Sequence, residues 1–193
     1  MSVATLPADV PECLRRIRVE EYHRMIEAGI LGEDEKVQLI DGMLVTMTPQ
    51  GRAHAFVIQE LTRILVRQLG DDFRVLSQLP LTLAGDSEPE PDVAVVGARE
   101  AASSTRHPGS ALLVIEVAGE SLRFDRQTKA ALYARHGIPE YWIVNLADAA
   151  IEVHRDPDPP SAVYRQAFAA HRGDALEAQF VQGLRIDAGV LFP

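Results

Sequence analysis

The stretch Ala111–Ala118 limits the possible folds more than any other part of the chain, because it is apolar on both faces except at Glu116. A strand of this kind belongs in a sheet that is covered on both sides. Residues 121–136 then have the apolar spacing of a helix, with Ser121 as its N-cap, and Glu140–Leu146 is a second apolar strand. A strand, a helix and a strand in this order predict a right-handed parallel crossover at the centre of the fold.

The segments around this crossover have the patterns of further strands and helices. Asp41-Gly42 readily supplies the positive φ angles of a two-residue turn and so predicts a hairpin. The predicted elements are the helix Val19–Ala28, the hairpin strands Val37–Ile40 and Met43–Met47, the helix Ala53–Leu69, the strands Phe73–Leu83, Asp92–Val96 and Ile151–Arg155, and two or three weak strands between Val163 and Ile186. Together they predict an α/β (α+β) fold, in which helices flank a mixed central sheet and an N-terminal helix and hairpin precede it.

Length and composition fit a single domain over residues 1–193, since 47% hydrophobic residues are ample for one core. Residues 1–14 contain two prolines and no clear period, which predicts a loose N-terminal arm. Cys13 is the only cysteine and cannot form an internal disulfide, as is usual in a reducing compartment. No apolar signal core or membrane-spanning run is visible. We therefore expect a soluble, cytoplasmic protein that does not bind a membrane.

The charge balance bears on the kind of partner. The chain has 19 basic and 28 acidic residues, a formal net charge of −9. This balance argues against a protein that grips a phosphate backbone over a wide surface. It still allows a local basic site.

Asp92, Glu116 and Lys129 are ionisable residues in segments that are otherwise apolar. An unpaired charge in such surroundings costs several kcal/mol, so these groups are expected to pair with one another or to hold an ion. Two converging carboxylates, Asp92 and Glu116, make a hard oxygen site suited to Mg²⁺, with Mn²⁺ as a possible substitute. A lysine from the following helix can hold the attacking water or neutralise charge on phosphorus. The expected chemistry is phosphodiester hydrolysis.

Each of these residues also has a purely structural interpretation. Asp92 follows a proline, as many turn aspartates do, and Glu116 can pair with an arginine. Lys129 can simply pair with Asp125, which lies four residues before it on the inward side of the helix.

Three further residues are candidates for supporting roles. Asp125 can orient Lys129, Glu90 is a possible accessory ligand, and Gln78 can reach the site from the adjoining strand. The alternatives are a solvent-facing strand position for Glu90 and an edge hydrogen bond for Gln78. His54, near the start of a predicted helix, can face a substrate, but a capping or core histidine is favoured. We expect Tyr133, Tyr141 and Trp142 to serve packing.

Other catalytic patterns are missing from the sequence. No serine has the surroundings of a nucleophile, and no spacing of cysteine and histidine suggests zinc. The glycine patterns of phosphate-binding and dinucleotide-binding loops are also missing.

The pattern Pro91-Asp92, Glu116-Val117-Ala118 and Lys129 resembles the PD-(D/E)xK signature of restriction-endonuclease-like nucleases. The surrounding EPEPDVAVV, LLVIEV and DRQTKAALYARHGIPEYWIV are more closely similar to the Uma-two family within that superfamily, from about residue 22 to residue 155. The resemblance implies that Asp92 and Glu116 bind metal and that Lys129 is the catalytic lysine. The usual lysine two positions after the glutamate is Ala118 here, so Lys129 has to act from the helix.

The resemblance implies a Mg²⁺-dependent endonuclease that acts on DNA. The alternative is a non-catalytic interaction module that retains the nuclease fold, which Gln38 and Met43 favour, because relatives often have acids at these two hairpin positions. Hydrolysis of a smaller phosphodiester is a third possibility. An enzyme that cuts both strands of a duplex is expected to be a homodimer, since the two-fold symmetry of the duplex calls for two active sites.

Overall fold

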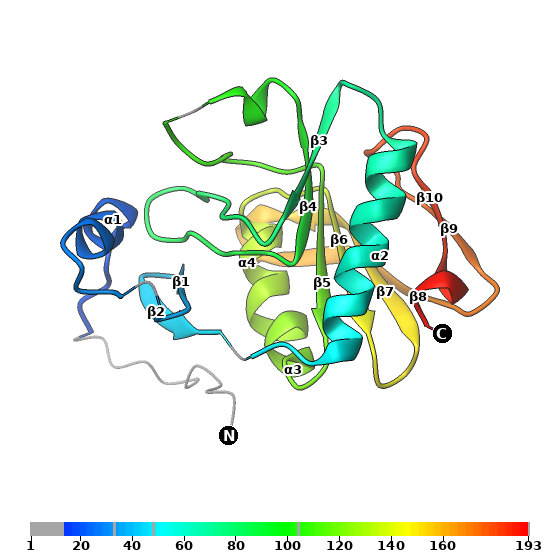
Figure 1. Cartoon of the computed structure of the whole chain (residues 1–193), viewed down its shortest axis with the longest axis horizontal. Coiled ribbons are helices and arrows are strands. Elements are labelled where there is room, and N and C mark those ends of the chain that lie inside the picture. The colour runs from blue at the N-terminus through cyan, green and yellow to red at the C-terminus, as the bar shows by residue number, and fades with distance from the viewer. Residues whose placement is uncertain (1–13, 33, 48, 104, 193) are drawn as a thin grey trace.

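The computed structural model describes residues 14–32, 34–47, 49–103 and 105–192. Its centre is a six-stranded mixed sheet (Figure 1). In the order in which they lie side by side, the strands are β3 (Phe73–Ser77), β4 (Val93–Gly97), β5 (Leu113–Ala118), β6 (Glu140–Asn145), β7 (Ala150–Asp158) and β8 (Val163–His171). Only β5 and β6 are parallel, and all other neighbours are antiparallel. The predicted mixed sheet and central parallel crossover are confirmed.

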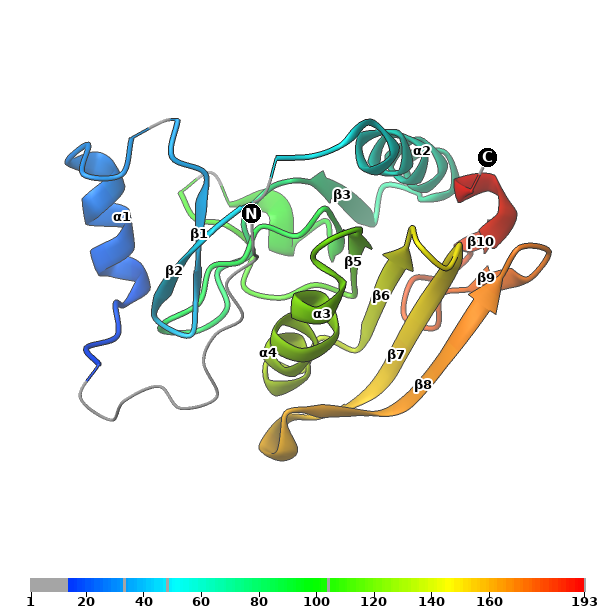
Figure 2. The same ribbon diagram turned by 90° about the horizontal axis from the view of Figure 1, so that it is seen from below.

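Helices cover both faces of this sheet, as Figure 2 shows edge-on. The helical elements are α1 (Val19–Glu27), α2 (Arg52–Gln68), α3 (Leu122–Phe124), the π-helical turn Asp125–Lys129, α4 (Ala130–Arg135), and short 3-10 turns at Glu100–Ala102, Pro159–Ser161 and Ala188–Leu191. Helix α2 packs on one face with Leu61 and Leu65 fully buried, together with the C-terminal strands β9 (Ala175–Glu177) and β10 (Arg185–Asp187). The face opposite is covered by α3 and α4, through Leu132 and Tyr133.

The N-terminal part forms a smaller cluster beside the sheet (Figure 2). Strands β1 (Val37–Ile40) and β2 (Met43–Thr46) make the predicted hairpin, and α1 packs on it. The turn residues Asp41 and Gly42 have φ angles of 48° and 73°, the positive values that an Asp-Gly turn supplies. A Cβ at Gly42 would overlap the Cβ of Arg16, so the turn also needs glycine for space.

Several predicted elements differ in detail. The strand predicted over Phe73–Leu83 ends at Ser77, because Gln78 takes a left-handed φ of 54° and Pro80 follows. Strand β7 runs to Asp158, beyond the predicted end at Arg155. The predicted arm 1–14 falls outside the described residues except at Leu14.

The helix predicted after Ser121 is not a regular α-helix. It opens as α3, widens into the π-helical turn Asp125–Lys129 and returns to α geometry in α4. Ser121 makes no side-chain cap of the helix, since its hydroxyl donates to Asp125 Oδ2 at 2.6 Å instead. None of the described helices is long and apolar enough to cross a membrane.

A buried carboxylate ties the C-terminal segment to the sheet. Glu140, at the start of β6, is fully buried and accepts hydrogen bonds from Trp142 Nε1 at 2.9 Å, Arg155 Nε at 2.8 Å and the Gln179 backbone at 2.8 Å. Removing one partner of such a pair leaves the other charge uncompensated. Glu140 therefore holds β6, β7 and the segment after β9 together.

We expect Glu140→Ala to lower the free energy of unfolding by about 3–5 kcal/mol, because Arg155 and two donors lose their acceptor. Urea unfolding followed by tryptophan fluorescence measures this change. Glu177→Ala is the matched control, since Glu177 is exposed. A loss no larger than that of the control would contradict the structural role of Glu140.

Candidate active site

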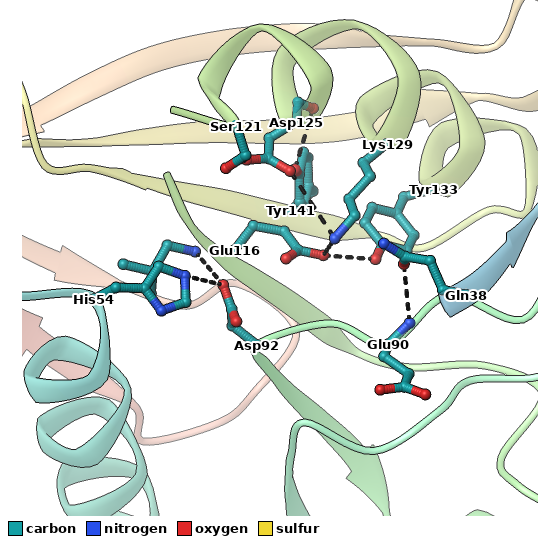
Figure 3. Close-up of polar contacts among 11 residues, drawn as sticks. Gln38, His54, Glu90, Asp92, Glu116, Ser121, Asp125, Lys129, Tyr133 and Tyr141 are labelled. Atoms are coloured by element: carbon teal, nitrogen blue, oxygen red, sulfur yellow. Dashed lines mark hydrogen bonds and ion pairs between the residues drawn. The ribbon is translucent and has the colours of Figure 1, made fainter. Parts of the chain in front are cut away.

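A cleft of about 430 Å³ opens where the hairpin, the start of α2, the end of β5 and the π-helical turn meet. Asp92, Glu116 and Lys129 all line it, and they are only 9%, 3% and 6% exposed. Strands β4 and β5 pair antiparallel with Val93 opposite Ile115, so the next pair along is Asp92 and Glu116. Opposite residues of an antiparallel ladder share a face of the sheet. The register thus brings both carboxylates under the π-helical turn (Figure 3).

Asp92 is held by contacts to one of its oxygens. Its Oδ2 accepts the backbone N–H of Val117 at 2.8 Å and lies 3.1 Å from His54 Nε2. Burial on its own lowers the pKa of His54, but the hydrogen bond to Asp92 and the charges of Asp92 and Glu116 outweigh burial and raise it. No described residue makes a hydrogen bond to Asp92 Oδ1, which leaves that oxygen for a ligand.

Glu116 is held in a similar way. Lys129 Nζ lies 2.8 Å from Glu116 Oε1, and the hydroxyl of Tyr133 donates to the same oxygen at 2.8 Å (Figure 3). Burial raises the pKa of Glu116 to about 8; Lys129 opposes this rise, while Asp92 and Asp125 add to it. Within the described chain, Oε2 of Glu116 has no hydrogen-bond partner. The carboxyl group therefore has one oxygen to spare.

Lys129 reaches this carboxylate from the π-helical turn. The backbone N–H of Ala130 donates to the carbonyl of Asp125, five residues back, and the Tyr141 hydroxyl donates to the same carbonyl at 3.2 Å. Both Asp125 and Lys129 are buried on the sheet side, with Lys129 Nζ 4.0 Å from Asp125 Oδ1. Burial lowers the pKa of Lys129, but the surrounding carboxylates outweigh burial and raise it. The ammonium group therefore keeps its proton.

Of the other predicted site residues, Asp125 and Glu90 line the cleft and Gln78 does not. Asp125 contacts Lys129 as expected, and Glu90 lines the cleft, where burial and Glu88 raise its pKa. Gln38, at a hairpin position where an acid was expected, lines the cleft and accepts the Glu90 backbone N–H at 3.3 Å. Gln78 does not line the cleft; its backbone N–H donates to the Asp92 carbonyl at 3.1 Å.

Sequence reasoning placed two residues of the cluster elsewhere. Tyr133 was expected to serve packing, yet its hydroxyl touches Glu116, and burial, followed by the charge of Glu116, raises its pKa so that it donates. His54 was favoured as a capping or core residue, yet it contacts Asp92 and lines the cleft. The sequence did contain one indication that Tyr133 belongs to the site, because it lies four residues after Lys129 on the inward face of the helix.

The donor set suits a hard divalent cation. In the described ranges no three His, Cys, Asp or Glu side chains are grouped as a metal site. Magnesium, however, uses one or two carboxylates and keeps its remaining positions for water and phosphate. The spare oxygens of Asp92 and Glu116 are of this kind, and a cation beside Glu116 would oppose the rise in its pKa that burial, Asp92 and Asp125 cause. The residues therefore fit Mg²⁺.

Comparisons with known proteins bear on the family and the fold of this chain. A family model described as "Putative restriction endonuclease", named Uma2, matches residues 19–189. A solved structure from Anabaena variabilis ATCC 29413, described as a putative nuclease belonging to DUF820, is similar with a TM-score of 0.71 and 18% identity, over 91% of this chain and 97% of that one. The type IIG restriction endonuclease BpuSI matches with a TM-score of 0.40 and 22% identity, over 59% of this chain and 12% of its own. A search of curated proteins found no match.

Proposed function

Because the chain belongs to the Uma2 family of putative restriction endonucleases, we propose that this nuclease is a metal-dependent endonuclease that hydrolyses DNA phosphodiester bonds. The observation that carries the metal-dependent chemistry is the convergence of Asp92, Glu116 and Lys129 in one cleft. Asp92 and Glu116 are the proposed ligands of Mg²⁺, through Asp92 Oδ1 and Glu116 Oε2. The bound cation would polarise the phosphate and lower the pKa of water.

The chain's own residues would prepare and stabilise the reacting groups. Lys129 is protonated, so it would act as a donor that orients water and neutralises charge on phosphorus, rather than as a base. Glu116 and Asp125 hold its ammonium group in place. Tyr133 fixes the Glu116 carboxylate by a hydrogen bond, and His54 does the same for Asp92.

Nicking of supercoiled plasmid tests the proposal. The purified protein is expected to convert the plasmid to open circles in Mg²⁺ or Mn²⁺ and to leave it intact in EDTA. The rival is an interaction module without catalysis, which Gln38 in the cleft favours. No metal binding in calorimetry, together with no nicking in either metal, would support the module and overturn the enzyme.

The products of cleavage test whether the protein acts as a homodimer, as we propose. Paired cuts in both strands of a duplex need two active sites, whereas a single nick needs one. A linear product from the first cleavage event, with a dimer mass in light scattering, would support the dimer. A monomer that yields open circles alone would contradict it.

The role assigned to Tyr133 predicts a graded effect. We expect Tyr133→Phe to lower kcat for nicking roughly tenfold with little change in KM, because a hydrogen bond to a charged group contributes about 1.5–3 kcal/mol. Tyr164→Phe is the matched control, since the Tyr164 hydroxyl donates to the Ile138 carbonyl away from the cleft. Equal kcat values for the two variants would contradict the role proposed for Tyr133.

A further inference from the structure

A second groove runs along α2, next to the cleft. It has a volume of about 620 Å³, within the range of small-ligand sites, and it lies between α2 and the end of β3, which are neighbours in Figure 1. The α2 residues that line it recur every three or four positions, so they form one face of the helix. Gln50 lines both the groove and the cleft, so the two hollows adjoin at this residue.

The groove combines an apolar floor with unpaired amides. Ile58 and Val66 supply the apolar part, and Val66 is 61% exposed. Gln50, Gln59 and Gln78 supply side-chain amides, and within the described chain none of these amides has a hydrogen-bond partner. An amide offers a donor and an acceptor side by side, which match the edge of a nucleobase.

Thr62 adds a polar atom that lacks a partner. Its hydroxyl is buried and makes no hydrogen bond within the described chain, although a helical threonine commonly bonds a carbonyl one turn back. A buried polar group without a partner is rare and calls for an explanation, such as a missing ligand. Gln78 is also held at a left-handed φ of 54°, a strained state that gathers at ligand sites.

Charge at the groove favours a phosphate. Arg67 lies on its rim, and no described acid forms an ion pair with it. Arg63 also lines the groove and pairs with Glu60 at 2.5 Å. In a chain of net charge −9, two arginines suit one or two phosphates of a single strand better than a wide duplex backbone.

We propose that the α2 groove binds an unpaired nucleotide of the substrate strand, one step along that strand from the phosphate in the cleft. The base lies on Ile58 and Val66, the amides and Thr62 contact its edge, and Arg67 contacts its phosphate. The Watson–Crick edge of a base is free only in an unpaired nucleotide. The inference rests on the proposed nuclease function and predicts a preference for single-stranded DNA.

Fluorescence anisotropy tests the groove without any cleavage. A labelled 12-nucleotide single strand and the blunt duplex of the same sequence are titrated in EDTA. The parent is expected to bind the single strand about tenfold more tightly, and Gln59→Leu and Arg67→Ala each to weaken that binding about tenfold. Thr62→Val, which keeps the shape and removes the hydroxyl, is expected to weaken it about threefold or more. Gln166→Ala and Arg106→Ala, both exposed outside the groove, are the controls.

The outcomes separate this inference from the proposed function. Single-strand binding unchanged by the groove variants, or equal affinity for the duplex, overturns the groove assignment even if the protein nicks plasmid. Weakened binding by these variants in a protein that never nicks sustains the groove and overturns the nuclease. In an active enzyme, the variants should raise KM for the oligonucleotide and leave hydrolysis of bis(p-nitrophenyl) phosphate unchanged.

Discussion

Replacing Lys129 with methionine is expected to lower the rate of plasmid nicking about 100-fold to 1000-fold, the usual cost of removing one group that stabilises transition-state charge. Methionine keeps most of the side-chain volume, so the loss isolates the ammonium group. Burial raises the pKa of Glu116 to about 8 even with Lys129 beside it, and without Lys129 the pKa rises further, so the carboxyl holds its proton more firmly at neutral pH. This protonation limits the structural damage and weakens the metal site further.

The sequence provides a matched control for this variant. Lys36 is the only other lysine of the chain, and it is exposed. Lys36→Met should nick at the parental rate, and both variants should keep the far-ultraviolet circular dichroism of the parent. A Lys129→Met protein with parental activity would exclude Lys129 from catalysis.

The second large effect is expected at Asp92. Asp92→Asn replaces one of the proposed ligand oxygens and should lower nicking at least about 1000-fold, since two carboxylates carry the whole metal site. In the parent, Mg²⁺ at 100 times its dissociation constant should stabilise the fold by about 2.7 kcal/mol. In the variant, the Mg²⁺-dependent rise in melting temperature should disappear.

Differential scanning fluorimetry with and without MgCl₂ measures this stabilisation apart from activity. Asp72→Asn serves as the control, because Asp72 is exposed outside the cleft. An Asp92→Asn protein that Mg²⁺ still stabilises as much as the parent would show that the metal binds elsewhere.

The centre of the fold could be read from the sequence because its elements have only one way to bury their apolar faces. The strand Leu113–Ala118 is apolar on both sides and so had to be central, and the Asp41-Gly42 turn fixed the hairpin register. The β3 boundary was missed because Gln78 adopts a left-handed conformation that no local pattern signals. The contacts of His54 were missed because they depend on how α2 is placed against β5.

The convergence of Asp92, Glu116 and Lys129 was predictable for a simple energetic reason. Charged groups in apolar segments need partners, and the crossover connection brings strand and helix together. The spacing places Tyr133 on the inward side of the helix with Lys129, but no local pattern shows the hydrogen bond of its hydroxyl to Glu116 or the π-helical turn that precedes it. A sequence read with an α-helical period cannot show such a turn.

Because of the π-helical turn, the position of Lys129 relative to β5 depends on the number of residues between them as well as on which residues they are. Each residue of an α-helix turns the chain by about 100°, so deleting one residue within Asp125–Lys129 would swing every later side chain of the segment around the axis. The outer surface of this segment should therefore tolerate many substitutions but no insertion or deletion. In a library of variants with random single-residue insertions and deletions, those within this short stretch should lose activity most completely.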